Sequence, residues 1–143
     1  MINKIINKLK NIPNKIKQIK LINQLDFIKL EKVIKLGTEY GGWFFIDDKD
    51  LYGTTIISAG LGEDASLDIE LINKYKCKII VVDPTLRAIE HYNDIINSLG
   101  QSRQRKYSST GKQPISSYNL EKISKENLIL VDKALFNVDN KTV

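Results

Sequence analysis

The sequence contains few of the residues that support disulfide, metal or membrane chemistry. Among its 143 residues are one cysteine, Cys77, and one histidine, His91. An internal disulfide is therefore excluded, and we expect no metal site. No apolar run is long enough to span a membrane, and the N-terminus lacks the continuous apolar region of a signal peptide. These absences predict a cytoplasmic protein.

The positive charge of the chain belongs to an N-terminal arm. Residues 1–36 carry nine lysines against two acidic residues, whereas residues 37–143 have a net charge of −2. Apolar side chains spaced three and four residues apart predict an amphipathic helical arm that Pro13 divides in two. The stripe runs through Ile2, Ile5, Leu9, Ile12, Ile16 and Ile19, and then through Leu25, Ile28, Val33, Ile34 and Leu36.

The arm has two open interpretations. It either packs on the domain as a helical lid, or it lies as a helix on an anionic membrane surface. We do not expect it to bind nucleic acid, because it has no arginine and no aromatic residue before Phe27, and both residue types are typical of single-strand binding surfaces.

Residues 54–83 show the most informative pattern of the chain. A β-branched run from Thr54 to Ala59 predicts a strand, and the glycines Gly60 and Gly62 predict a tight turn. Leu67, Leu71, Ile72 and Tyr75 then recur at helical spacing, and residues 77–82 form a second apolar run that ends at Asp83. This order is typical of a nucleotide-binding unit with an acidic residue about 20 residues after the glycines.

Two carboxylates after the turn indicate the charge of the ligand. Glu63 and Asp64 stand where a helix N-terminus after a glycine turn would otherwise receive a phosphate. A pyrophosphate about 4 Å from one carboxylate would meet roughly 4 kcal/mol of repulsion at an effective dielectric constant near 20. A ligand with positive charge would be attracted instead. S-adenosylmethionine, with its sulfonium and ammonium groups, fits this field better than a dinucleotide.

The flanking segments complete the expected unit. Glycines 37, 41 and 42 predict a turn before a short strand at residues 43–46, whose Trp43 we expect in the core. A helix is expected from Leu86 to Leu99, with Leu86, Ile89, Ile96 and Leu99 facing the sheet and His91 in solvent. Residues 101–118 are expected to form a solvated, mobile loop, followed by a short helix at residues 120–124.

The third strand is expected at residues 128–131, and it is expected to continue through residues 134–136 toward a turn at Asp139 and Asn140. Three strands and two helices leave an apolar sheet edge unpaired. The sequence therefore predicts a truncated sheet that a further segment or an oligomer completes. The chain is then the N-terminal part of a larger protein or a truncated reading frame.

The combined motifs resemble those of FkbM-type S-adenosylmethionine-dependent methyltransferases. The resemblance covers about residues 36–143 and is carried by residues 37–43, 57–68, 82–85, 87–89 and 134–137. It implies a Rossmann-like class I methyltransferase sheet for residues 37–143. The implied reaction is O-methyl transfer to a sugar or small metabolite. Because the strands that bring the substrate are missing, we expect this portion to be inactive by itself.

The resemblance also implies roles for individual residues. Gly60 and Gly62 would let the backbone approach the methionine part of the cofactor, and Glu63 and Asp64 would lie beside its positive groups. Asp83 would accept the ribose hydroxyls, whereas Ala134 and Leu135 would border the adenine. Ser58 departs from the class pattern, which often has an acid there, and Asp64 replaces a usual third glycine.

Two other functions remain open. Gly60-x-Gly62-x-x-Ala65 satisfies the dinucleotide-binding fingerprint, so the chain could be part of an oxidoreductase, although the acidic pair argues against it. Alternatively, the chain is not an enzyme but a remnant whose basic arm binds a membrane or a partner protein.

Overall fold

The computed structural model of the chain describes residues 32–134. Of the arm predicted at residues 1–36, residues 1–31, with the break at Pro13, lie outside the described residues. So do Leu135, Phe136 and the turn expected at Asp139 and Asn140.

A parallel sheet of three strands forms the centre of the described chain. Strands β3 (Thr55–Ala59), β4 (Lys78–Val82) and β5 (Leu128–Val131) lie in the order β3-β4-β5. Their β-branched residues suit extended backbone, and β3 and β4 agree with the expected strands to within one residue. The expectation that the third strand continues through Ala134 was wrong, because β5 ends at Val131. The predicted α/β class is confirmed at this level: a parallel sheet flanked by helices.

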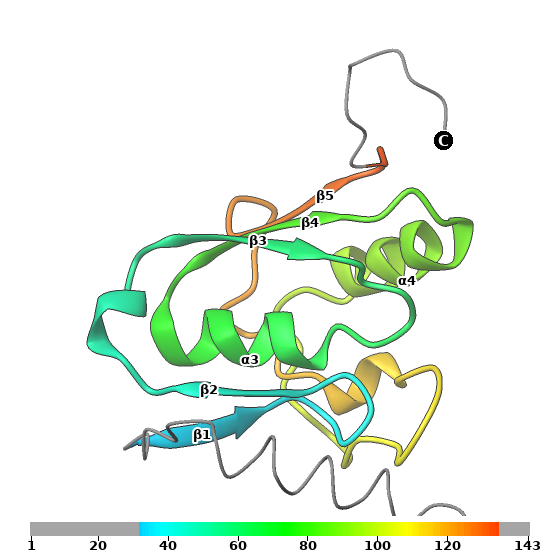
Figure 1. The fold of residues 1–143 in the computed structure, drawn as a ribbon. Helices are drawn as coiled ribbons and strands as arrows, with labels where there is room; N and C mark the ends of the chain where they lie inside the picture. Colours follow the sequence, from blue (N-terminus) through cyan, green and yellow to red (C-terminus); the bar gives the residue numbers. More distant parts are fainter. Residues whose placement is uncertain (1–31, 135–143) are drawn as a thin grey trace, which may run out of the picture. The chain divides into compact units, whose positions relative to one another are not determined.

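Both helices lie on the same face of this sheet (Figure 1). Helix α3 (Ser66–Tyr75) connects β3 to β4, and helix α4 (Leu86–Asn97) follows β4. The core is formed by fully buried side chains from α3, β4, α4 and β5, among them Ile69, Ile72, Ile79, Ile95 and Leu128. The other face of the sheet carries an aligned row of isoleucines from the three strands, Ile57, Ile80 and Ile129.

Residues 33–36 form a strand, so the prediction that they continue the helical arm was wrong. Strand β1 (Val33–Leu36) pairs antiparallel with β2 (Trp43–Ile46), in a register that sets Leu36 opposite Trp43. This hairpin covers the side of α3 that faces away from the sheet (Figure 1). The spacing of apolar residues fits either a helix or a strand over so short a run, and pairing with β2 settles it as a strand.

Helix α4 buries a different side from the one expected. Its buried residues are Ala88, His91 and Ile95, whereas Leu86 is 70% exposed. The prediction that Leu86 faces the sheet and that His91 lies in solvent was therefore wrong. The alternative stripe at residues 88, 91 and 95 has equally good helical spacing, and the polar ring of His91 finds a partner in the Tyr118 hydroxyl.

Residues 101–118 are tied to the domain by specific bonds. Arg103 Nε donates to the Ser117 carbonyl over 2.6 Å, and its guanidinium carbon lies 3.9 Å from the centre of the Tyr107 ring. Gln113, Ser117 and Tyr118 are buried, so the expectation of a solvated loop was wrong for this part.

Two short 3-10 helices complete the described elements, at Lys49–Leu51 and Ile115–Ser117. The helix expected at residues 120–124 is absent there, where the chain makes a turn instead. Strand β5 ends at Val131, before Ala134.

Candidate functional site

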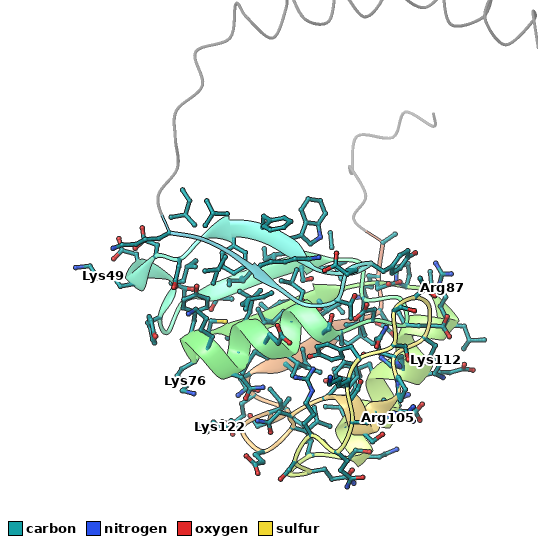
Figure 2. The ribbon with its side chains drawn as sticks, turned by 90° about the horizontal axis from the view of Figure 1, so that it is seen from below. Lys49, Lys76, Arg87, Arg105, Lys112 and Lys122 are labelled. Carbon is teal, nitrogen blue, oxygen red and sulfur yellow. The ribbon has the colours of Figure 1, made fainter. Side chains whose placement is uncertain are left out.

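A cavity of about 570 Å³ lies where β3 and β4 end and α3 begins. Its lining includes four carboxylate residues, Glu63, Asp64, Asp68 and Asp83, and one cationic residue, Arg87. Parallel α/β sheets bind ligands at the carboxyl ends of their strands, and this cavity has that position. In Figure 2, Arg87 lies at the opposite end of α3 from Lys76 and Lys49.

The glycine turn joins β3 to α3. Gly60 has φ +92° and Gly62 has φ +53°, backbone angles that residues with a side chain rarely adopt. A Cβ atom at either position would meet nothing within 4 Å. The two glycines are therefore needed for the direction of the backbone, and they leave the turn open toward the cavity.

Asp83, at the end of β4, holds this turn in place. Its Oδ2 atom accepts the backbone N–H groups of Leu61 and Gly62, both over 2.9 Å. Its Oδ1 atom accepts from the backbone N–H and the hydroxyl of Thr85, over 2.9 and 2.7 Å. Burial raises the pKa of Asp83, but the four hydrogen bonds outweigh it and lower that pKa to about 2.

These bonds bear on the role expected for Asp83. A carboxylate offers about four acceptor positions, and all four are engaged within the protein. To accept ribose hydroxyls as well, Asp83 would have to release some of its present donors. Its ribose contact stays a prediction, whereas its hold on the glycine turn is an observed contact.

Asp64 connects the glycine turn to the β1–β2 hairpin. Its Oδ1 atom accepts the backbone N–H of Ser66 over 3.0 Å, and its Oδ2 atom accepts the Thr38 hydroxyl over 2.6 Å. The hairpin turn approaches so closely that a Cβ atom at Gly41 would lie 2.7 Å from Asp64 Oδ2. Asp64 is thus a structural link as well as a source of negative charge.

Asp68, in the first turn of α3, is the acidic residue of the cavity that the sequence pattern did not single out. It is 3% exposed, and its Oδ1 atom has no hydrogen-bond partner among residues 32–134. Burial raises the pKa of Asp68 to about 6, the Ser58 hydroxyl opposes that rise, and the charge of Asp64 adds to it. The sequence shows an acidic residue in the first turn of the expected helix, but its burial depends on how α3 packs against the sheet.

Aromatic residues lie at the edge of the same cavity. Trp43 and Tyr40, from β2 and the hairpin turn, are 70% and 74% exposed and contribute to the lining. The expectation that Trp43 belongs to the core was wrong. Trp43 shares a face of β2 with the partly buried Phe45, but it is the first residue of this short strand and lies at the edge of the cavity.

A buried tyrosine, hydrogen-bonded to a buried histidine, contacts the start of α3. The Tyr118 hydroxyl accepts the Ala65 backbone N–H over 3.0 Å and lies 2.8 Å from His91 Nε2. Burial and the charge of Lys112 lower the pKa of His91, so the ring is neutral at pH 7. The two residues are 27 positions apart, and no local pattern indicates their contact.

The structure brings together most of the residues predicted for the site. Gly60, Gly62, Glu63, Asp64 and Asp83 all line the cavity. Ala134 is exposed beyond the end of β5 and is not among the lining residues. Leu135, its predicted neighbour at the adenine, lies outside the described residues.

Within residues 32–134, no helix is long and apolar enough to cross a membrane, and no cluster of three or more His, Cys, Asp or Glu side chains is arranged to hold a metal ion. Comparison of the chain with models of protein families, with curated proteins and with solved structures finds no match.

Proposed function

We propose that this chain contains the cofactor-binding site of an S-adenosylmethionine-dependent methyltransferase of the FkbM type, with a Rossmann-like class I fold. The observation that carries the proposal is the charge of the cavity, where four carboxylates face one arginine. A ligand with positive charge is favoured there, and S-adenosylmethionine brings a sulfonium and an ammonium group.

The hydrogen bonds of the glycine turn support the same choice. In dinucleotide-binding proteins the N–H groups of this turn and of the following helix receive the pyrophosphate. Here the N–H groups of Leu61 and Gly62 donate to Asp83, and the N–H of Ser66 donates to Asp64. The places of a bound anion are thus already taken by carboxylates of the protein.

The exposed aromatic residues fit the other parts of the cofactor. Tyr40 and Trp43 offer ring faces at the cavity edge. Such faces stack on a planar base and attract a cation through the ring quadrupole. Either contact would hold an adenosyl sulfonium compound, in addition to the predicted contacts of Ala134 and Leu135 with the adenine.

The proposed reaction is O-methyl transfer to a sugar or small metabolite. S-adenosylmethionine, when bound, would supply an electrophilic methyl group to the acceptor hydroxyl. The carbon–sulfur bond would break with its electron pair staying on sulfur, the hydroxyl proton would pass to water, and S-adenosylhomocysteine would be the product. Such a displacement depends on positioning the two reactants in line.

Binding measurements test the proposal directly. We expect calorimetric titration of the chain at low salt to show binding of S-adenosylmethionine and S-adenosylhomocysteine. NAD should bind at least about tenfold more weakly because of the carboxylates. Binding should also change the fluorescence of Trp43, the only tryptophan of the chain. Tight binding of NAD without any response to the adenosyl compounds would reject the proposal in favour of an oxidoreductase fragment.

A pair of matched variants separates the cavity charge from the net charge. Glu63→Gln removes a carboxylate of the lining, whereas Glu90→Gln removes one from an exposed position of α4 outside it. Glu63→Gln should weaken S-adenosylmethionine about fivefold and strengthen NAD, and Glu90→Gln should change neither. Equal effects of the two variants would contradict a role for the field of the cavity.

A further inference from the structure

Asp68 is a buried carboxylate whose bonding is incomplete. It lines the cavity, it is 3% exposed, and its Oδ1 atom has no partner within the described part of the chain. A buried acceptor without a donor destabilises a fold, and a buried charge does so more strongly. Native proteins retain such groups where a ligand supplies the missing donor.

Two N–H groups at the start of α3 have partners other than Asp68, whose carboxyl interacts only with its own backbone N–H there. Acidic residues in a first helical turn are often explained by capping of free N–H groups. In α3 the N–H of Ala65 donates to the Tyr118 hydroxyl, and the N–H of Ser66 donates to Asp64. Two other groups therefore cap the helix start.

Asp83 and Asp64, two of the other acidic residues of the cavity, already accept hydrogen bonds from the protein. Asp83 accepts four hydrogen bonds, and each oxygen of Asp64 accepts one. Glu63 is half-buried and has access to solvent. Asp68 thus combines deep burial with an acceptor that has no partner among the described residues.

Asp68 and Ser58 lie together in the cavity. Both residues line it, and the Ser58 hydroxyl, on β3, acts on the Asp68 carboxyl. The end of β3 and the first turn of α3 thus place a carboxylate and a hydroxyl side by side, a pair that can accept the N–H groups of an ammonium.

We propose that Asp68 binds the α-ammonium group of the amino-acid end of the cofactor, accepting its N–H protons at Oδ1. This inference rests on the proposed function. It assigns the amino-acid end of the ligand to the first turn of α3, and it makes Asp68 a binding residue and not a catalytic one.

Calorimetric titration of two ligands into the wild-type chain and into one variant tests the assignment. S-adenosylhomocysteine carries the ammonium, whereas 5′-methylthioadenosine has the same adenosyl thioether without the amino-acid end. Asp68→Asn should weaken S-adenosylhomocysteine by about tenfold or more and methylthioadenosine by less than about twofold. Asp50→Asn, at an exposed residue outside the cavity, should change neither affinity.

The outcomes distinguish the two proposals. If the wild-type chain binds both adenosyl compounds equally well, or if Asp68→Asn weakens both alike, Asp68 does not bind the ammonium, while the proposed function stands. If the wild-type chain binds neither compound, the proposed function fails and this inference fails with it. Failure of Asp68→Asn to fold, checked by circular dichroism, would show that the carboxylate is structural and would also overturn the assignment.

Discussion

The Thr38 hydroxyl donates to Asp64 Oδ2 over 2.6 Å, and the Thr38 backbone N–H donates to Ser66 Oγ over 2.9 Å, so this one residue makes two bonds between the β1–β2 hairpin and the start of α3. The same hydroxyl oxygen accepts the Gly41 backbone N–H over 2.7 Å. Thr38 is 4% exposed, so water does not readily replace it. The wall of the cavity that carries Tyr40 and Trp43 is held against the glycine turn through this residue.

Replacing Thr38 by valine tests that link. Thr38→Val keeps the shape of the side chain but leaves Asp64 Oδ2 and the Gly41 N–H without partners, so we expect a loss of about 1–3 kcal/mol in the free energy of unfolding. Urea denaturation measures it. Thr55→Val, at an exposed threonine of β3, is the control and should change stability little. Equal stabilities of the two variants would show that the hairpin is held by other contacts.

Asp68 should make the fold less stable as the pH rises. The pKa of its carboxyl is about 6 in the folded chain and 3.8 in the reference state. The folded state therefore binds more protons between these values, and stability falls as the pH rises through this window. Asp68→Asn removes the effect, so its gain in stability should be near zero at pH 4 and up to about 3 kcal/mol above pH 6.

Denaturant unfolding of both proteins at several pH values measures this difference. The ionisable groups that interact with Asp68 are Asp64, Cys77 and Tyr118. Burial raises the pKa of Cys77 and of Tyr118, so neither titrates between pH 4 and 7. Asp50→Asn should show no pH-dependent gain. A variant Asp68→Asn that is less stable than the wild type at neutral pH would indicate a structural carboxylate.

His91 should remain neutral at pH values where an exposed histidine is charged. Burial and Lys112 lower its pKa below 6.5. As the pH falls below 6.5, the unfolded chain takes up a proton that the folded chain does not, so stability decreases with acidification. Because the chain has one histidine, its ring resonances in a nuclear magnetic resonance titration are unambiguous. A midpoint at or above 6.5 would contradict the burial of the ring beside Tyr118.

Local sequence patterns predicted the elements that depend on local chemistry. The β-branched runs around Ile57 and Ile80 form the expected parallel strands, and Gly60 and Gly62 form the expected turn. Residues 33–36 were assigned to the wrong element because four apolar residues fit two periodicities, and only pairing with β2 decides between them.

The parts of the site that were missed depend on contacts between distant residues. His91 is buried with its ring nitrogen against the Tyr118 hydroxyl, and Trp43 is exposed because it lies at the end of its short strand, although it shares a face with the partly buried Phe45. Asp68 has the spacing of an ordinary first-turn acid, and nothing in its neighbours along the chain shows that Ser58 and the sheet enclose it. Such relationships follow from packing and have no signature in composition or spacing.

The isoleucine row formed by Ile57, Ile80 and Ile129 lies on the side of the sheet that neither described helix covers. Ile57 is 68% exposed, and water wets such a surface poorly. Sulfate and phosphate strengthen the burial of apolar surface, so self-association through this side should increase with protein concentration and in those buffers. Dilute samples in chloride buffers are therefore the appropriate condition for measuring ligand affinities of this chain.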